Sequence, residues 1–439
     1  MRDYTLPLES GGTFVPIKEE FLHYVWKYKL FDFQNLIGCN GEKIKPIQLG
    51  MHNEDSGPDF LNARLEINGL IWAGTVEMHL KSSDWYAHHH EVDDNYNAVI
   101  LHVVWEYDVP VLRSNGDEIV TLVLKSFVHE NSLKNYLALL YKKEQWILCE
   151  KDVQHISSLF LNSWLTRLYF ERLETKSKQI LDLLQASAND WEAVLFVLMA
   201  KCFGMKLNGQ AFLNLARSFE FKVFRKQQTL TNGLEVLLFG QAGFLNSEME
   251  DVYGKELKKE FDFIKHKYKL VPIFYGQFSF FRLRPANFPT IRISQLAQIY
   301  QQHQNLFSKI QSLNAITDYY ELFDLKTSSY WETHYTFGKI SSKKSKKISK
   351  AFVDLLLINT IIPVMYTYQK IKGSHEFEKL EKLVQLIKPE KNTIISNFNK
   401  LEIVAKNAMD SQALIQLKNE YCKPKKCLHC AIGLQLLKK

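Results

Sequence analysis

The chain has 439 residues, of which 46% are hydrophobic, 23% charged and 13% aromatic. This composition is typical of a folded protein of two or three domains and excludes a largely disordered chain. Six cysteines are too few for a disulfide scaffold, and the first residues lack the apolar core of a signal peptide, so we expect a cytoplasmic protein. The most apolar stretch, residues 351–368, contains Asp354, Asn359 and Pro363, which predicts a buried helix or strand pair and no membrane span.

The net charge of +7 is unevenly distributed along the chain. Residues 1–130 carry 10 Lys and Arg against 20 Asp and Glu, whereas residues 331–439 carry 20 Lys against nine acidic residues. Eight of the 14 histidines also lie in residues 1–130. An acidic, histidine-rich segment suits a cation site, and a basic segment suits a surface that faces a polyanion.

Residues 1–130 carry the pattern of one helix followed by several strands, which indicates an α/β or α+β arrangement. The helix is expected within residues 17–36. Asn68-Gly69 is a favoured hairpin turn between two alternating runs. Residues 98–105 are almost entirely apolar, as in a central strand buried on both faces. The strands are expected at residues 45–49, 60–67, 70–79, 98–105 and 118–124.

Helical periodicity dominates the rest of the chain. A segment rich in Pro, Arg and aromatic residues interrupts it at residues 278–289, and residues 339–350 contain six lysines. We therefore predict an α/β domain over residues 1–130 and a larger, mostly helical region over residues 131–439. The helices are expected at residues 133–146, 156–184, 191–203, 209–219, 291–307 and from 349 onward.

Acidic and histidine side chains are densest between residues 53 and 91. Glu77, His79 and Lys81 alternate with apolar residues, so in a strand they share one face. The predicted hairpin returns the end of this strand to the start of the strand that follows Asp59. Asp59 and Glu77 could therefore share Mg²⁺ or Mn²⁺, which prefer oxygen ligands, while a neighbouring Lys or His orients a water. Turn and surface roles for both carboxylates are the alternative.

Three consecutive histidines follow this strand. His88 with His90, or His79 with His88, could bind a transition metal through imidazole nitrogen, although a solvated loop is the other interpretation. His102 lies in the apolar run and is expected to be a hydrogen-bonded core residue.

The combination of Pro58-Asp59, Glu77, His79 and Lys81 resembles the core motif of the PD-(D/E)XK nuclease superfamily. The resemblance implies a restriction-endonuclease-like core, a mixed sheet with flanking helices, in which the Asp and the Glu bind Mg²⁺ and a Lys two residues later assists the attacking water. Position 79 is His in this chain, so either His79 substitutes or Lys81 reaches in from one strand repeat further on. A glutamate on the preceding helix often joins the metal in that superfamily, which points to Glu20 or Glu19.

Over nearly its full length the chain is also similar to an uncharacterised bacterial domain family that is grouped with these nucleases. This second resemblance implies no particular activity. The shared phrases are Gly57-Pro-Asp-Phe60, Val76-Glu-Met-His79, Ser83-Asp-Trp85, His88 to His90, Tyr96-Asn97 with Val99-Ile-Leu-His-Val-Val104, and Leu357-Ile-Asn-Thr360 with Ile362-Pro363.

Three cysteines cluster near the C-terminus, Cys422, Cys427 and Cys430. In a cytoplasmic chain such a cluster indicates metal binding more than disulfide bonds. A zinc site needs four nitrogen or sulfur ligands, and Cys149 is a candidate for the fourth. The arrangement is also similar to that of some PD-(D/E)XK nucleases, in which one distant cysteine and three near the C-terminus hold an iron–sulfur cluster. Ordinary reduced thiols in a helical tail are the alternative.

Two groups of basic residues could contact nucleic acid. Arg282, Arg284 and Arg292 lie among phenylalanines and could hold phosphates and stack on bases, or form a structural network over a Pro-rich bend. Lys343 and Lys344 belong to the lysine-rich segment, which could contact phosphates or form a solvated loop.

Together with these patterns, the resemblance to the PD-(D/E)XK superfamily implies a Mg²⁺- or Mn²⁺-dependent nuclease that hydrolyses DNA phosphodiester bonds. Asp59 and Glu77 would bind the metal with help from Glu20, and His79 or Lys81 would orient the water. The alternative is a catalytically degenerate nuclease-fold scaffold that binds nucleic acid or a protein partner, because a bare acidic domain repels DNA. A metal hydrolase that uses its histidines on another substrate is the third possibility.

Overall fold

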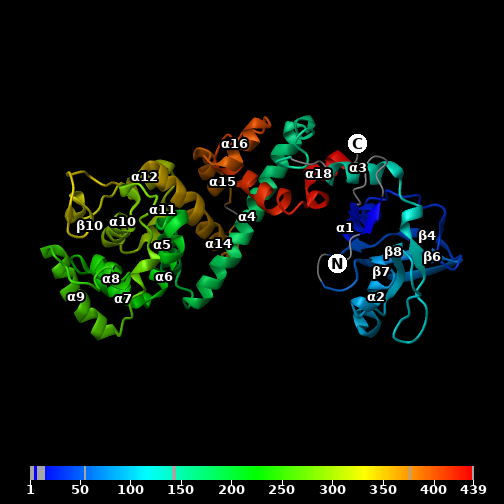
Figure 1. Ribbon diagram of the computed structural model, residues 1–439, viewed down its shortest axis with the longest axis horizontal. Helices are drawn as coiled ribbons and strands as arrows, with labels where there is room; N and C mark the ends of the chain where they lie inside the picture. The colour runs from blue at the N-terminus through cyan, green and yellow to red at the C-terminus, as the bar shows by residue number, and fades with distance from the viewer. Residues whose placement is uncertain (1–3, 7–14, 54–55, 141–144, 375–376, 438–439) are drawn as a thin grey trace. The chain divides into compact units, whose positions relative to one another are not determined.

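A computed structural model describes residues 4–6, 15–53, 56–140, 145–374 and 377–437 of the chain, and Figure 1 shows its helices and strands. The chain divides into two compact units. Unit 1 comprises Met1–Trp164 and Leu417–Lys439, and unit 2 comprises Leu165–Gln416. The sequence pattern changes near residue 130, but the first boundary between the units lies later, after Trp164. The C-terminal segment, residues 417–439, belongs to unit 1 together with the N-terminal residues.

A mixed sheet of seven strands forms the centre of unit 1, in the order β3-β4-β6-β7-β8-β9 with β5 paired to β6. Neighbouring strands from β3 to β7 are antiparallel, whereas β7, β8 and β9 are parallel. A smaller sheet pairs β1 (Tyr4–Leu6) with β2 (Val15–Ile17). The strands of the main sheet are β3 (Leu36–Ile37), β4 (Lys43–Gln48), β5 (Met51–His52), β6 (Phe60–Ile67), β7 (Leu70–Lys81), β8 (Val99–Glu106) and β9 (Thr121–Val123).

The hairpin of β6 and β7 forms at the predicted turn. Asn68 and Gly69 both have positive φ, at 51° and 83°, as a two-residue turn of this kind requires. The register pairs Phe60 with Val76 at the far end of the hairpin, so the residue before Phe60 meets the residue after Val76. Strand β8 is buried from Val99 to Trp105, as expected for a strand covered on both faces.

Helix α1 (Glu19–Lys27) packs against β7 and covers one face of the sheet. Its apolar side chains, Phe21, Leu22, Val25 and Trp26, are fully buried in the same core cluster as residues of β6, β7 and β8. The helix is shorter than the predicted span of residues 17–36. The other helices of unit 1 include α2 (Asp84–Ala87), α3 (Glu130–Leu140), the first residues of α4 (Ser158–Ala186) and α18 (Ala431–Leu437).

The C-terminal helix α18 packs against α3, and Figure 1 shows the two side by side. The predicted helix at residues 133–146 corresponds to α3, and its later part, residues 141–144, lies outside the described residues. Unit 1 is thus closed by a segment that follows unit 2 in the sequence.

Unit 2 is mostly helical and contains one small hairpin of β10 (His334–Thr336) and β11 (Lys339–Ile340). An α/β region followed by a mostly helical one agrees with the predicted fold class at this level. Besides the greater part of α4, the helices are α5 (Trp191–Phe203), α6 (Met205–Arg217), α7 (Phe221–Gln228), α8 (Gly233–Gln241), α9 (Val252–Tyr268), α10 (Pro289–Gln302), α11 (Leu306–Ser312), α12 (Ile316–Leu322), α13 (Lys350–Leu356), α14 (Ile362–Ile371), α15 (Phe377–Leu386), α16 (Thr393–Lys400) and α17 (Ala408–Gln416).

The most apolar stretch is a helix, in which a π-helical turn at Leu357–Ile361 joins α13 to α14. In the described part of the chain, Lys350–Ile371 is the one helix that is long and apolar enough to cross a membrane. Of its most apolar window, 72% is buried inside the protein, as in the core helix of a folded unit.

Candidate metal centre

Asp59 and Glu77 face one another across the β6–β7 hairpin. The main-chain N–H of Asp59 donates to Glu77 Oε2 at 3.1 Å, and Asp59 Oδ2 accepts from the main-chain N–H of Met78 at 2.9 Å. The two carboxylates are therefore fixed by the backbone of the opposite strand. The fold brings together the pair of side chains that the hairpin pattern predicted.

Helix α1 adds Glu19 and His23, which are one helical turn apart. His23 Nε2 lies 3.2 Å from Asp59 Oδ2 and 3.8 Å from Glu19 Oε1. Glu19, His23 and Asp59 each offer one ligand atom, and these atoms all lie within 4.8 Å of one another. Glu20 is exposed, because consecutive helical residues point about 100° apart, so Glu19 takes the place expected for Glu20.

Burial and mutual repulsion disturb the ionisation of these groups. Burial raises the pKa of Glu19 to about 7, and the negative charge of Asp59 adds to this effect. Burial and Asp59 also raise the pKa of Glu77 well above its ordinary value. Burial alone would lower the pKa of His23, but the carboxylate of Asp59, 3.2 Å from its Nε2, raises it. The site therefore concentrates more negative charge than its own residues neutralise, which a bound cation would relieve.

His79 lies on the same face of β7 as Glu77 and begins a second group of possible ligands. His79 Nε2 lies 3.1 Å from His88 Nδ1 and 3.7 Å from Glu77 Oε1, and His90 Nε2 lies 3.4 Å from the same oxygen. The ligand atoms of His79, His88 and His90 all lie within 4.8 Å of one another. Between them, His89 is exposed and has a φ of 61°, which reverses the chain and turns both neighbours toward His79.

Behind this group, His102 is fully buried on β8, and its Nε2 lies 2.8 Å from His79 Nδ1. This agrees with the interpretation of His102 as a hydrogen-bonded core residue. Burial lowers the pKa of His102 to about 3, and burial with the neighbouring imidazoles lowers that of His79 well below its ordinary value. Both rings are therefore neutral at ordinary pH.

Lys81 lies at the end of β7, two residues beyond His79, within electrostatic range of Asp108. Its main-chain N–H donates to Asp84 Oδ2. His79 therefore occupies the position beside Glu77 that the sequence motif gives to a lysine. The helix residue His23 was not among the predicted site residues. Its spacing of four from Glu19, on the same face of an amphipathic helix, is the signal that could have found it.

Four cysteines of unit 1 form a separate group. Cys149, Cys422, Cys427 and Cys430 are free thiols that lie within electrostatic range of one another. Burial, followed by the neighbouring thiols, raises the pKa of Cys149. Among the described residues, no three of these sulfur atoms lie within 4.8 Å of one another. The fold therefore unites the distant cysteine with the C-terminal three, at spacings wider than around one zinc ion, where ligand atoms are about 4 Å apart.

The basic residues predicted to contact nucleic acid lie in unit 2. Arg282, Arg284, Lys343 and Lys344 are exposed. Arg292 is only 6% exposed, and its guanidinium donates to Gln295 Oε1 and Asn287 Oδ1 and lies over the ring of Phe352. Arg292 is thus occupied as part of a structural network, which corrects its assignment as a phosphate contact.

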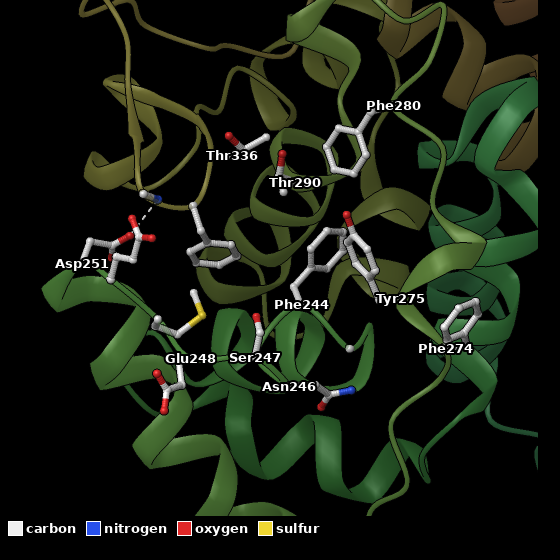
Figure 2. A pocket seen from close by; sticks show the side chains of 15 residues that line it. Phe244, Asn246, Ser247, Glu248, Asp251, Phe274, Tyr275, Phe280, Thr290 and Thr336 are labelled. Carbon is white, nitrogen blue, oxygen red and sulfur yellow. Dashed lines mark hydrogen bonds between the residues drawn. The ribbon is translucent and has the colours of Figure 1, made fainter.

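Unit 2 also contains a cavity of about 610 Å³ with aromatic walls. Figure 2 shows the rings of Phe244, Tyr275 and Phe280 around it, with Asp251 at one side. Two of the polar groups that line it already have partners, since Asp251 Oδ2 accepts from Gly338 N–H and Thr290 Oγ1 donates to the carbonyl of Tyr335. Polar residues, among them Asn246, Glu248 and Glu250, also line the cavity, whereas the groups of possible metal ligands found among the described residues lie in unit 1.

Comparison with known proteins identifies the family to which the chain belongs. No curated protein and no solved structure is significantly similar to it. The sequence profile of a family described as protein of unknown function (DUF2851) matches residues 19–393, which include Glu19, Asp59, Glu77 and the histidines described above. The chain belongs to the DUF2851 family.

Proposed function

We propose that this protein is a divalent-metal-dependent nuclease that hydrolyses phosphodiester bonds of DNA, with its reactive centre in unit 1. The observation that carries the proposal is the pairing of Asp59 and Glu77 across the hairpin, completed by Glu19 and His23 from α1. Carboxylate oxygens suit Mg²⁺ and Mn²⁺, and the imidazole of His23 favours Mn²⁺. A cation bound there would lower the pKa of a water and stabilise negative charge on the phosphoryl group.

The order of the elements supports a PD-(D/E)XK-like core. A helix with an acidic ligand, an antiparallel hairpin with Asp59 and Glu77, and a buried parallel strand follow one another, as the resemblance implies. Of the two residues considered for orienting the attacking water, His79 is the one beside Glu77. Its depressed pKa keeps it in the form that accepts a proton.

The test is a cleavage assay on single- and double-stranded DNA with Mg²⁺ or Mn²⁺. We expect Glu77→Gln and Asp59→Asn to lower the rate by ~100-fold or more, because each removes a charge that holds the cation. Glu20→Gln is the matched control, since it changes an exposed carboxylate next to Glu19 on the same helix, and it should cleave like the wild type. Equal cleavage by wild type and Glu77→Gln would reject the proposed centre, and a wild type that cleaves neither substrate would favour the scaffold alternative.

We further propose that Cys149, Cys422, Cys427 and Cys430 hold a metal centre that ties the C-terminal segment to unit 1. Four neighbouring free thiols from distant parts of the chain fit soft metals, which thiolates prefer. Their wide spacing favours an iron–sulfur cluster over a single zinc ion.

A further inference from the structure

Glu77 presents its two carboxylate oxygens to two different groups of ligands. Oε2 accepts from the main-chain N–H of Asp59, and the Glu77 carboxylate lies within electrostatic range of Glu19 and His23. Oε1 faces His79 at 3.7 Å and His90 at 3.4 Å. A carboxylate in this position can bridge two metal ions, as happens in two-metal hydrolytic centres.

The imidazole side has the dimensions of a tetrahedral site. With metal–nitrogen bonds of about 2.0–2.1 Å, tetrahedral ligand atoms are about 3.4 Å apart. The observed separations of 3.1 Å between His79 Nε2 and His88 Nδ1, and of 3.4 and 3.7 Å from Glu77 Oε1, lie close to this value. The three imidazole nitrogens also all lie within 4.8 Å of one another, so a small movement of Glu77 and the rings would complete a set of four ligands.

The surroundings hold these rings in place and leave a path for an ion. His79 is 1% exposed, and in the tautomer that frees its Nε2, its Nδ1–H donates to His102 Nε2 at 2.8 Å. The ring of His90 stacks on Tyr96 at 3.7 Å and contacts the edge of Trp85. His88 is exposed, so one ligand faces solvent.

We infer that His79, His88 and His90, with Glu77 Oε1, form a second metal site of unit 1 that takes a tetrahedral transition ion such as Zn²⁺. Imidazole nitrogen suits zinc, whereas the carboxylate-rich side of Glu77 suits Mn²⁺ or Mg²⁺. The two sites share Glu77, which would make the centre dinuclear and of mixed ligand type. In this arrangement His79 would be a metal ligand, and the bound Zn²⁺ would take over from His79 the activation of the water.

The inference is tested by titrating the full-length, chelator-treated chain with Co²⁺, whose visible absorption is characteristic of tetrahedral coordination. We expect one such ion per chain at this site, in addition to any cobalt bound by the cysteines, and an affinity of this site at least ~10-fold weaker in His88→Ala and in His90→Ala. His89→Asn is the matched control, because it changes the exposed histidine between them and Asn tolerates positive φ. It should bind as the wild type does. Far-ultraviolet circular dichroism of each variant checks that it is folded.

Three further arms separate this site from the others. Asp59→Asn should lose DNA cleavage but keep the tetrahedral cobalt spectrum, so failure of the proposed nuclease activity and failure of this site are distinguishable. Cobalt bound to thiolates adds a strong near-ultraviolet band, and Cys427→Ser should remove that band alone. Metal analysis of the untreated protein should find zinc that falls by half or more in His88→Ala. Unchanged cobalt affinity in both His88→Ala and His90→Ala, or equal weakening in His89→Asn, would overturn the inference.

Discussion

At the scale of single residues, the candidate centre depends on side chains whose neighbours are fixed by the backbone. Asp59 is positioned by the N–H of Met78, and His79 by the ring of His102. The alternation of Glu77 and His79 along a strand was sufficient to predict their common face. The sequence did not predict that Glu19, and not Glu20, lies near Asp59. Both glutamates fit the start of an amphipathic helix, and only the position of β6 beside the helix distinguishes them.

Because His102 is buried in its neutral form, we expect it to destabilise the metal-free protein in mild acid. Its pKa falls from 6.5 to about 3 on folding, so below pH 6.5 the unfolded chain takes up a proton that the folded chain does not. Stability is then lost at up to ~1.4 kcal/mol per pH unit, or about 2 kcal/mol between pH 7 and pH 5. The raised pKa values of Glu19 and Glu77 act in the opposite direction.

A comparison of wild type with His102→Gln isolates this effect, because the two glutamates are present in both chains. Urea unfolding at pH 7 and pH 5, with chelator present, should show the wild type losing about 2 kcal/mol relative to the variant. Parallel pH dependence of the two chains would contradict the assigned neutral state of His102.

At the scale of elements, the sequence predicted structure that forms between neighbouring residues, but it did not predict which distant segments come together. The hairpin of β6 and β7 and the buried strand β8 were readable from alternation and from Asn68-Gly69. The convergence of His88 and His90 was not, because it depends on a left-handed residue at His89, a conformation that sequence does not reveal for a histidine. The sequence also did not predict that unit 1 extends past residue 130, because nothing in the sequences of helices α3 and α18 indicates the unit to which they belong.

The metal centre proposed for the four cysteines leads to a prediction about the stability of unit 1. Cys427→Ser should release bound iron or zinc and lower the stability of unit 1, because a metal that binds only the folded state stabilises it. Cys39→Ser is the matched control, since Cys39 is an exposed free cysteine of the same unit. Elemental analysis, visible absorption and thermal unfolding measure the outcome. Equal metal content in wild type and Cys427→Ser would show that these thiols hold no metal.

At the scale of the whole molecule, acidic and basic side chains are concentrated in different parts of the chain. Residues 1–130 carry a net charge of −10, and the exposed residues Arg282, Arg284, Lys343 and Lys344 belong to unit 2. The exposed arginines and lysines of unit 2 are the residues that we predict to contact the phosphates of DNA. The distribution of charged residues along the sequence indicated this division. The structure adds that the guanidinium of Arg292 donates hydrogen bonds to Gln295 and Asn287.

Removing two exposed arginines should weaken DNA binding in a salt-dependent manner. In the cleavage-deficient Glu77→Gln chain, Arg282→Ala with Arg284→Ala should reduce the slope of log affinity against log salt by about 2, roughly 0.9 per lost phosphate contact. Fluorescence anisotropy with labelled DNA measures the slope. Arg217→Ala, an exposed arginine on α6, is the control. An unchanged slope in the double variant would exclude these arginines from the DNA contact.

The return of the last segment to unit 1 has a consequence for synthesis on the ribosome. Helix α18 and three of the four clustered cysteines leave the exit tunnel only after unit 2 has been made. Unit 2, whose chain is continuous from Leu165 to Gln416, can therefore finish folding first, although it is second in the sequence. Until residues 431–437 have been made, unit 1 lacks the helix that packs on α3, and a nascent chain that stalls near residue 416 carries an incomplete unit 1. Unit 1 is thus completed last, although it contains the first residues of the chain.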